Sequence, residues 1–452
     1  MSATESNRTR LSDPGAHRRL WRIAAPMMLS NVSIAVLGLV DTAVIGHLSD
    51  PSYLAGIALA TVLFDFLYWG VTFLRMGTTG VTAQVHGGGD KVGLRTTLRD
   101  ALSVALALAL AMLVWRDEIS AFGLSLLGGG DESSAHAARY YAIKIWGAPG
   151  VLATMVFIGW LIGVQNARAA MTLAAVPCLL HAGLDIVLVV GLELGIEGAA
   201  WAALTTAYCS ALLGGVLVWR ELRRRGALHG QLPWRFRDLR KLLRLNGNIA
   251  LRTLCLIATF AYFTKQGASQ GDTVLAANAI LLNFQMLTAL ALDGFANALE
   301  ALVGDAIGAR DRRAFIESIV VGSAWSGVFA IMFTLAYAVT GHGLIHALTD
   351  LAGVRAAAGN YLVWAAVSPL ISVWCFVFDG IFIGATRGAE MRNSMLVASV
   401  GVFVPSWHVL QSFGNHGLWG AFMLFFAARG VSMGWYFFRI DRRGGFVPVP
   451  RR

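Results

Sequence analysis

The chain has 452 residues, of which 56% are hydrophobic and only 14% are charged, and its mean hydropathy is +0.63. This composition excludes a soluble protein, because there are too few polar residues to cover a water-exposed surface. The net charge of +10 would suit a nucleic-acid-binding protein, but the basic residues lie in alternate loops between apolar stretches. We therefore predict an all-α polytopic membrane protein that binds no nucleic acid.

Twelve apolar stretches are long enough to cross a bilayer. In chain order they cover roughly residues 20–46, 53–77, 97–115, 140–163, 170–192, 197–219, 245–266, 273–299, 315–340, 359–385, 394–411 and 417–438. Lysine and arginine gather at the start of the chain, in the loops after the even-numbered spans and in the basic segment at 220–244, whereas most of the opposite loops are short or acidic. The positive-inside rule then predicts that both termini are cytoplasmic.

The sequence repeats itself across its two halves. The stretch "LAGIALATVLFDF" from Leu54 aligns with "LAANAILLNFQML" from Leu275, and the same offset of 221 residues brings "HGGGD" at 86–90 onto "IGARD" at 307–311. Each half contains six spans, so both halves enter the membrane in the same orientation. The predicted organisation is an N-terminal tail (1–19), a first six-helix bundle (20–220), a basic linker (221–244), a second bundle (245–438) and a C-terminal tail (439–452).

Three aspartates interrupt apolar spans of the first bundle: Asp41 in span one, Asp65 in span two and Asp185 in span five. A carboxylate inside a bilayer is costly and is usually functional. His181 precedes Asp185 by four residues and therefore shares its helical face. Because two carboxylates in a low-dielectric pocket tend to share a proton, we predict a pocket in which protons compete with a cationic ligand. The structural alternatives are an aspartate that caps a helix or pairs with an arginine, and a histidine that only packs.

Asn31 and Pro26, both in the first span, complete the predicted ion-coupling and substrate-binding set. Proline removes a backbone donor, so the first helix can bend at Pro26 and move Asp41; a static kink is the alternative. Asp65 is equally compatible with an ion pair to Arg75 or with a place in an aqueous vestibule.

The second bundle has its own ionisable residues. Asp293 and Glu300 are seven residues apart on one face of span eight, Asp379 lies in span ten, and Arg252 in span seven is a candidate partner. We predict a buried polar network that shapes this bundle, with a direct role in ion coupling as the alternative.

The sequence lacks the motifs of several other chemistries. It contains no Walker motif, no nucleophile elbow and no metal-ligand cluster, and its four cysteines have no paired spacing. The glycines of "GTTG" and "GIFIGATRG" suit close helix packing better than phosphate binding. We therefore predict no catalytic residue, no metal and no cofactor, and a protein that is not an enzyme.

Four motifs together resemble the multidrug and toxic compound extrusion (MATE) transporters, in particular the branch of the DNA-damage-inducible protein F. They are "LGLVDTAVIGHL" at 37–48, "LRMGTTGVTAQ" at 74–84, "LDGFANALEALVGDAIGARD" at 292–311 and "FDGIFIGATRGAEMRNSM" at 378–395. The resemblance implies a V-shaped, pseudo-two-fold pair of six-helix bundles in the bacterial inner membrane. It also implies a monomer, in contact with membrane lipids, that exports amphipathic and often cationic compounds in exchange for protons or sodium.

The resemblance assigns Asp41 and Asp185 to the ion-coupling pocket, but the chain departs from the family pattern nearby. His181 replaces a common asparagine, and Ala203 replaces a common threonine. Sodium prefers several hard oxygen ligands, whereas histidine titrates near neutral pH. We therefore expect coupling to protons, with sodium as the alternative.

A lipid or lipid-linked saccharide flippase is the alternative function, because such flippases resemble MATE transporters in general architecture. A pyrophosphate headgroup needs converging arginines or lysines, whereas the first-bundle candidates are mainly acidic. Arg75 and Arg252 keep this alternative open.

Overall fold

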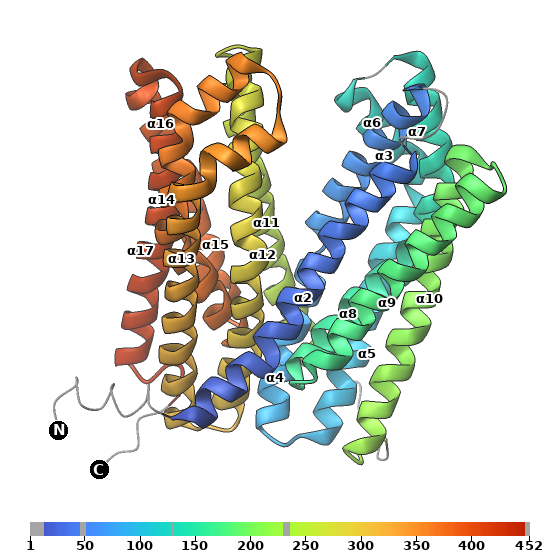
Figure 1. Ribbon diagram of the computed structural model, residues 1–452. Helices are drawn as coiled ribbons and strands as arrows, with labels where there is room; N and C mark the ends of the chain where they lie inside the picture. Colours follow the sequence, from blue (N-terminus) through green and yellow to red (C-terminus); the bar gives the residue numbers. More distant parts are fainter. Residues whose placement is uncertain (1–12, 46–50, 129, 229–235, 448–452) are drawn as a thin grey trace. The chain divides into compact units, whose positions relative to one another are not determined.

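The protein is helical throughout its described length. The computed structural model describes residues 13–45, 51–128, 130–228 and 236–447, and for residues 34–45, 51, 52 and 54 it describes the backbone alone. No strand occurs in these ranges (Figure 1). The prediction of an all-α membrane protein is therefore confirmed.

The contacts divide the chain into two compact units, residues 29–246 and residues 1–28 with 247–452. We call them the first unit and the second unit. The division cuts two continuous helices, α2 (Pro14–Ile45) after Met28 and α11 (Phe236–Ala268) after Asn246. Each of these helices therefore contributes residues to both units.

The remaining helices belong to one unit each. Those of the first unit are α3 (Pro51–Gly70), α4 (Phe73–Gly87), α5 (Lys91–Val114), α6 (Arg116–Leu127), α7 (Asp131–Lys144), η1 (Ile145–Gly147), α8 (Ala148–Gly163), α9 (Ala167–Asp185), η2 (Ile186–Gly191) and α10 (Gly195–Arg224). Those of the second unit are α12 (Asp272–Gly308), α13 (Arg312–Leu348), α14 (Ala352–Gly384), α15 (Gly388–Leu396), η3 (Val397–Phe403), α16 (Val404–Leu410), η4 (Gln411–Phe413) and α17 (Gly414–Arg442).

Ten segments of the described residues are long and apolar enough to cross a membrane. The last of them, Gly388–Arg442, has 55 residues and covers two of the predicted spans; the chain turns between them at Gly414, whose φ of +57° favours glycine. Helix α2 is a further helix of spanning length, with 32 residues. One helix was not predicted, because α6 forms where the sequence suggests a loop. Asp117 and Glu118 in its first turn stabilise it, since negative charges there interact favourably with the positive end of the helix dipole.

Pairs of glycines let helices approach closely in both units. A Cβ at Gly159 of α8 would lie 2.4 Å from the Arg75 carbonyl oxygen of α4, and one at Gly163 would lie 2.9 Å from that of Thr79. In the second unit, a Cβ at Gly380 or Gly384 of α14 would lie 2.6 Å from a carbonyl oxygen of α12. The two pairs are separated by 221 residues, the offset of the sequence repeat. These glycines therefore serve backbone packing at equivalent places in the two halves.

An aspartate begins an equivalent helix in each unit. The Asp90 side chain accepts a hydrogen bond from the Gly93 amide (2.8 Å) before α5, and Asp311 accepts from the amides of Arg313 and Ala314 before α13. These are N-caps, which satisfy amide groups that a helix leaves without partners. The aligned motifs "HGGGD" and "IGARD" thus have the same local role.

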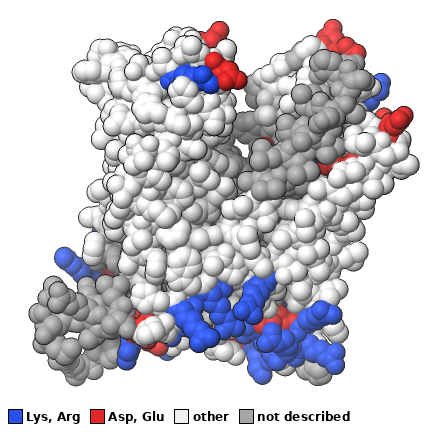
Figure 2. Space-filling view, viewed as in Figure 1, with Lys and Arg blue, Asp and Glu red and all other residues white. Residues whose placement is uncertain are grey.

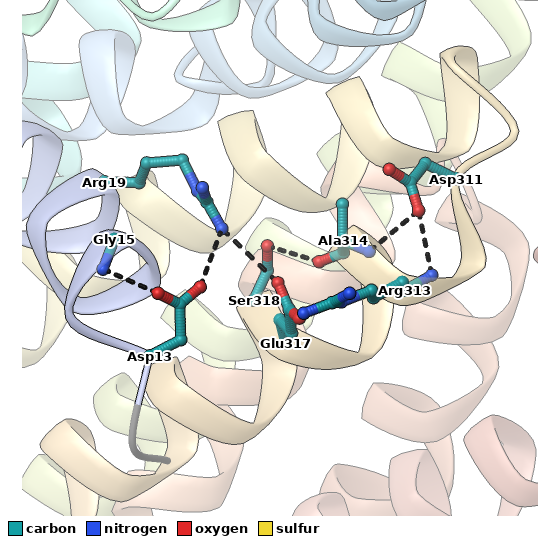
Figure 3. A network of polar contacts seen from close by, with 8 residues as sticks. All are labelled: Asp13, Gly15, Arg19, Asp311, Arg313, Ala314, Glu317 and Ser318. Atoms are coloured by element: carbon teal, nitrogen blue, oxygen red, sulfur yellow. Dashed lines mark hydrogen bonds and ion pairs between the residues drawn. The ribbon is translucent and has the colours of Figure 1, made fainter. Parts of the chain in front are cut away.

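A polar network holds the start of α2 to the start of α13 within the second unit (Figure 3). Arg19 lies 3.4 Å from the buried Glu317, and the Arg313 side chain donates to the same carboxylate at 2.7 Å. Asp13 accepts from the Gly15 amide and lies 4.0 Å from Arg19. This network fixes where the first helix begins.

Aromatic side chains fill the cores of both units. In the first unit Phe64 stacks on Tyr68 and Tyr141. In the second unit Phe263, from the stretch "FAYF", packs on Trp419 and Phe422 and is fully buried. By contrast, Phe66 and Trp69 of "FDFLYWG" are more than half exposed. The aromatic stretches therefore contribute to the cores and to the outer faces of the helices.

Candidate functional site

Helix α9 carries the best-defined ionisable pair of the first unit. Asp185, its last residue, is 1% exposed, and its Oδ2 atom lies 3.4 Å from His181 Nε2. The spacing of four residues places both side chains on one face, as the sequence predicts. The backbone continues as the π-helix η2 directly after Asp185. Single π-helical turns occur often at functional sites.

The geometry of this pair brings two titratable groups together. The imidazole nitrogen and the carboxylate are close enough to exchange a proton directly or through one water molecule. Their low exposure makes the charge state of either group depend strongly on the other.

The other first-span residues of the predicted set lie in α2. The side chain of Asp41 is outside the described part of the structure, so its proximity to Asp185 stays a prediction. Asn31 is half-buried and belongs to the first unit, and Pro26 lies inside the helix two residues before the division between the units.

Asp65 is exposed on α3, and its electrostatic partner in the described structure is Lys144 of α7. The Lys144 Nζ atom donates to the Tyr140 hydroxyl at 3.1 Å and lies 4.8 Å from the centre of the Phe64 ring. The sequence offers Arg75 or an aqueous vestibule for Asp65 and does not single out Lys144. The signal was present, because a lysine in the apolar stretch "YYAIKIWG" is itself an intramembrane charge.

The second unit contains a buried cluster of three charged side chains. Arg252 of α11 and Arg429 of α17 both donate to Asp379 Oδ2, and each residue of the trio is at most 8% exposed. Asp293 of α12 interacts electrostatically with both arginines. Within the described residues, Asp379 Oδ1 and Arg252 Nε have no hydrogen-bond partner.

The predicted polar network contains Arg252 and Asp379, and Arg429 is a member that it lacks. A lone arginine in the apolar stretch "FFAARGVSM" was the available signal. Glu300 is 2% exposed on α12, and its carbonyl oxygen lies against Gly384 of α14. Among the described residues, no group of three or more histidine, cysteine or acidic side chains is arranged to hold a metal ion.

A multi-pass helical membrane protein with two units and buried ionisable side chains in each has the construction of a secondary membrane transporter. The chain belongs to the MatE family, whose sequence profile matches residues 26–187 and 249–407, one segment in each predicted bundle.

Named relatives span nearly the whole chain. It is 41% identical over 417 residues to DNA damage-inducible protein F of Escherichia coli (strain K12), which covers 92% of this chain and 91% of that protein. It is 28% identical over 461 residues to a probable multidrug resistance protein NorM of Rhizobium meliloti (strain 1021), with 96% of each chain covered.

Solved structures show the same fold. A MATE protein in a bent conformation superposes with a TM-score of 0.86 and 19% identity, covering 98% of both chains. An outward-facing multidrug resistance MATE family transporter superposes with a TM-score of 0.84 and 20% identity, covering 94% of this chain and 96% of that one. The predicted family and fold are therefore confirmed.

Proposed function

We propose that the protein is a multidrug efflux antiporter that exports amphipathic, cationic organic compounds in exchange for protons. The observation that carries the proposal is the pair of the buried Asp185 and the partly buried His181, with 3.4 Å between Nε2 and Oδ2. A carboxylate beside a second titratable group binds one proton at a time and loses its attraction for a cation when it is protonated. The named multidrug resistance relatives support the substrate class.

The cycle follows from competition at this pair and at Asp41, which we place in the same pocket. The deprotonated site attracts the cationic compound. Proton binding on the opposite side of the membrane neutralises the carboxylates and releases the compound. Bending of α2 at Pro26 would couple the charge state to a change in pocket volume.

The basic ends of the helices support an orientation with both termini in the cytoplasm of a bacterial inner membrane. Most of the Lys and Arg atoms visible in Figure 2 lie at its lower edge. Helix α10 has Arg223 and Arg224 in its last turn. The positive-inside rule places such ends on the cytoplasmic side.

In the second unit we favour a structural role for the charged trio. Two arginines share one carboxylate oxygen of Asp379, so neither is left to bind a pyrophosphate headgroup without breaking a buried ion pair. This engagement supports an antiporter over a flippase of lipid-linked saccharides.

The test is transport of a fluorescent organic cation into proteoliposomes that contain the purified protein. We expect uptake when a proton gradient is imposed and none when an equal sodium gradient replaces it. Uptake that follows sodium alone would contradict proton coupling. Uptake with neither gradient, together with scrambling of labelled lipid, would favour the flippase.

A further inference from the structure

The last two turns of α17, together with Arg443 directly after the helix, form a basic and aromatic cleft on the outside of the second unit. Five residues line this cleft, which has a volume of about 420 Å³: Trp435, Phe438, Arg439, Arg442 and Arg443. Their spacing of three, one, three and one residues places them on a single helical face. All five side chains are exposed.

The arginines of this cleft keep their positive charge available for a ligand. Asp441, the acidic residue among them, forms an ion pair with Arg312 of α13, with 2.7 Å between Nη2 and Oδ2. Glu390 is engaged by Arg387 at 3.3 Å. Among the described residues, no carboxylate lies within ion-pair distance of Arg439, Arg442 or Arg443.

The order of the side chains along the helix gives the cleft two chemically different ends. Trp435 and Phe438 come first, on the apolar part of the span, and the three guanidinium groups follow at its end. The Arg439 guanidinium lies 5.0 Å from the centre of the Trp435 ring, which holds it against the aromatic face. Aromatic side chains followed by arginines match the border between the acyl chains and the headgroups of a bilayer.

We propose that this cleft binds an anionic phospholipid, with the phosphate on the arginines and the glycerol and upper acyl region on Trp435 and Phe438. Arginine forms paired hydrogen bonds to phosphate oxygens. Free inorganic phosphate offers the same anion chemistry but has nothing to place against the two aromatic side chains. The site does not depend on which compound the protein transports.

The end of α10 in the first unit provides a matched comparison. At an offset of 219 residues, Arg220, Arg223 and Arg224 occupy the positions of the three cleft arginines, and all are exposed. Two differences reduce the fit for a lipid headgroup. Val216 stands in the place of Trp435. Glu221 forms ion pairs with Arg224 at 3.2 Å and with Arg225 at 2.8 Å.

The experiment measures lipid binding to the purified, delipidated full-length protein by native mass spectrometry. The probes are dioleoylphosphatidylglycerol and dioleoylphosphatidylcholine, which share their acyl chains and differ in headgroup charge. We expect the wild type to prefer the anionic lipid. The triple variant R439Q/R442Q/R443Q should lose about tenfold or more of its affinity for it, while R220Q/R223Q/R224Q, which removes the same charge, should keep most of it.

Three outcomes would overturn the proposal. An equal loss in both triple variants would show that only overall charge matters, and no loss in the α17 variant would show that the cleft is not the site. Complete displacement of the lipid by millimolar inorganic phosphate would identify a site for a free anion. If the α17 triple variant unfolds, as judged by its melting temperature, the single variant Arg442→Gln replaces it. Arg442→Gln should lower the affinity for the anionic lipid by a smaller factor, and an unchanged affinity would also overturn the proposal.

Discussion

The two units share a helical framework and differ in how they use buried charge. Glycine pairs at the same offset bring α8 against α4 and α14 against α12, and equivalent aspartates cap α5 and α13. Within this common framework, the first unit has one pair of titratable side chains, His181 and Asp185, on a single helix. The second unit joins α11, α14 and α17 through Arg252, Asp379 and Arg429. The pair of the first unit thus lies on one helix, whereas the ion pairs of the second unit connect three helices.

From this difference we infer that the two duplicated halves have different roles. We propose that the first unit binds and releases the proton and that the ion pairs between α11, α14 and α17 stabilise the second unit. The following variants test this proposal, from the largest expected effect to the smallest.

Replacing Asp185 or Asp41 with asparagine should abolish proton-driven transport. Each change removes the titratable group while it keeps the volume of the side chain, so the melting temperature should stay close to that of the wild type. Transport in proteoliposomes and thermal unfolding in detergent measure the two effects. Transport at the wild-type rate in either variant would remove that aspartate from the coupling site.

Replacing Asp379 with asparagine should damage folding more than any change in the first unit. It leaves two buried arginines without their counter-charge, which costs roughly 3–5 kcal/mol. Unfolding in detergent measures the loss. A matched triple variant, R252M/D379L/R429M, removes all three charges together and should recover much of the stability. A stable Asp379→Asn protein that no longer transports would instead give this cluster a direct role in coupling.

Replacing Pro26 with alanine should slow transport several-fold while the substrate still binds. Proline lowers the cost of bending α2 close to the point where the helix passes from one unit to the other. Pro369, inside α14 of the second unit, is the control, and its replacement by alanine should leave the rate unchanged. If labels on α2 and α9 give the same distances across a pH titration in the wild type and in Pro26→Ala, Pro26 is not the hinge.

Replacing His181 with asparagine should change the pH at which transport is half-maximal, because it removes the titratable group whose Nε2 atom lies 3.4 Å from Asp185 Oδ2. The measurement is the initial transport rate across a series of buffers at a constant gradient. An unchanged pH profile would assign His181 to packing alone.

Replacing Asp90 or Asp311 with alanine should cost about 1 kcal/mol in either unit, because each change removes an N-cap. Equal losses would confirm that the duplicated framework is energetically equivalent in the two halves. Asp117→Ala is the control, since that exposed side chain lies in the first turn of α6 without capping it, and its removal should cost less than the loss of an N-cap. Unequal losses would show that one half depends more strongly on this cap.

The sequence by itself determined the membrane class, the helical fold and the internal repeat. Hydropathy fixes where spans lie, because backbone polar groups in lipid must be satisfied within a helix. Local spacing was enough to pair His181 with Asp185, since residues four apart share a helical face. The aligned aspartates of "HGGGD" and "IGARD" also marked equivalent positions, although their role as caps became visible only in the structure.

Only the tertiary structure decided which distant charges meet. Arg429 lies 50 residues beyond Asp379, and Lys144 lies on a different helix from Asp65, so no local periodicity connects them. Helix rotation and packing choose such partners, and these depend on the shapes of all neighbouring side chains. For the same reason the sequence could not show that Asp441 is bound to Arg312, while none of the described carboxylates forms an ion pair with Arg439, Arg442 or Arg443.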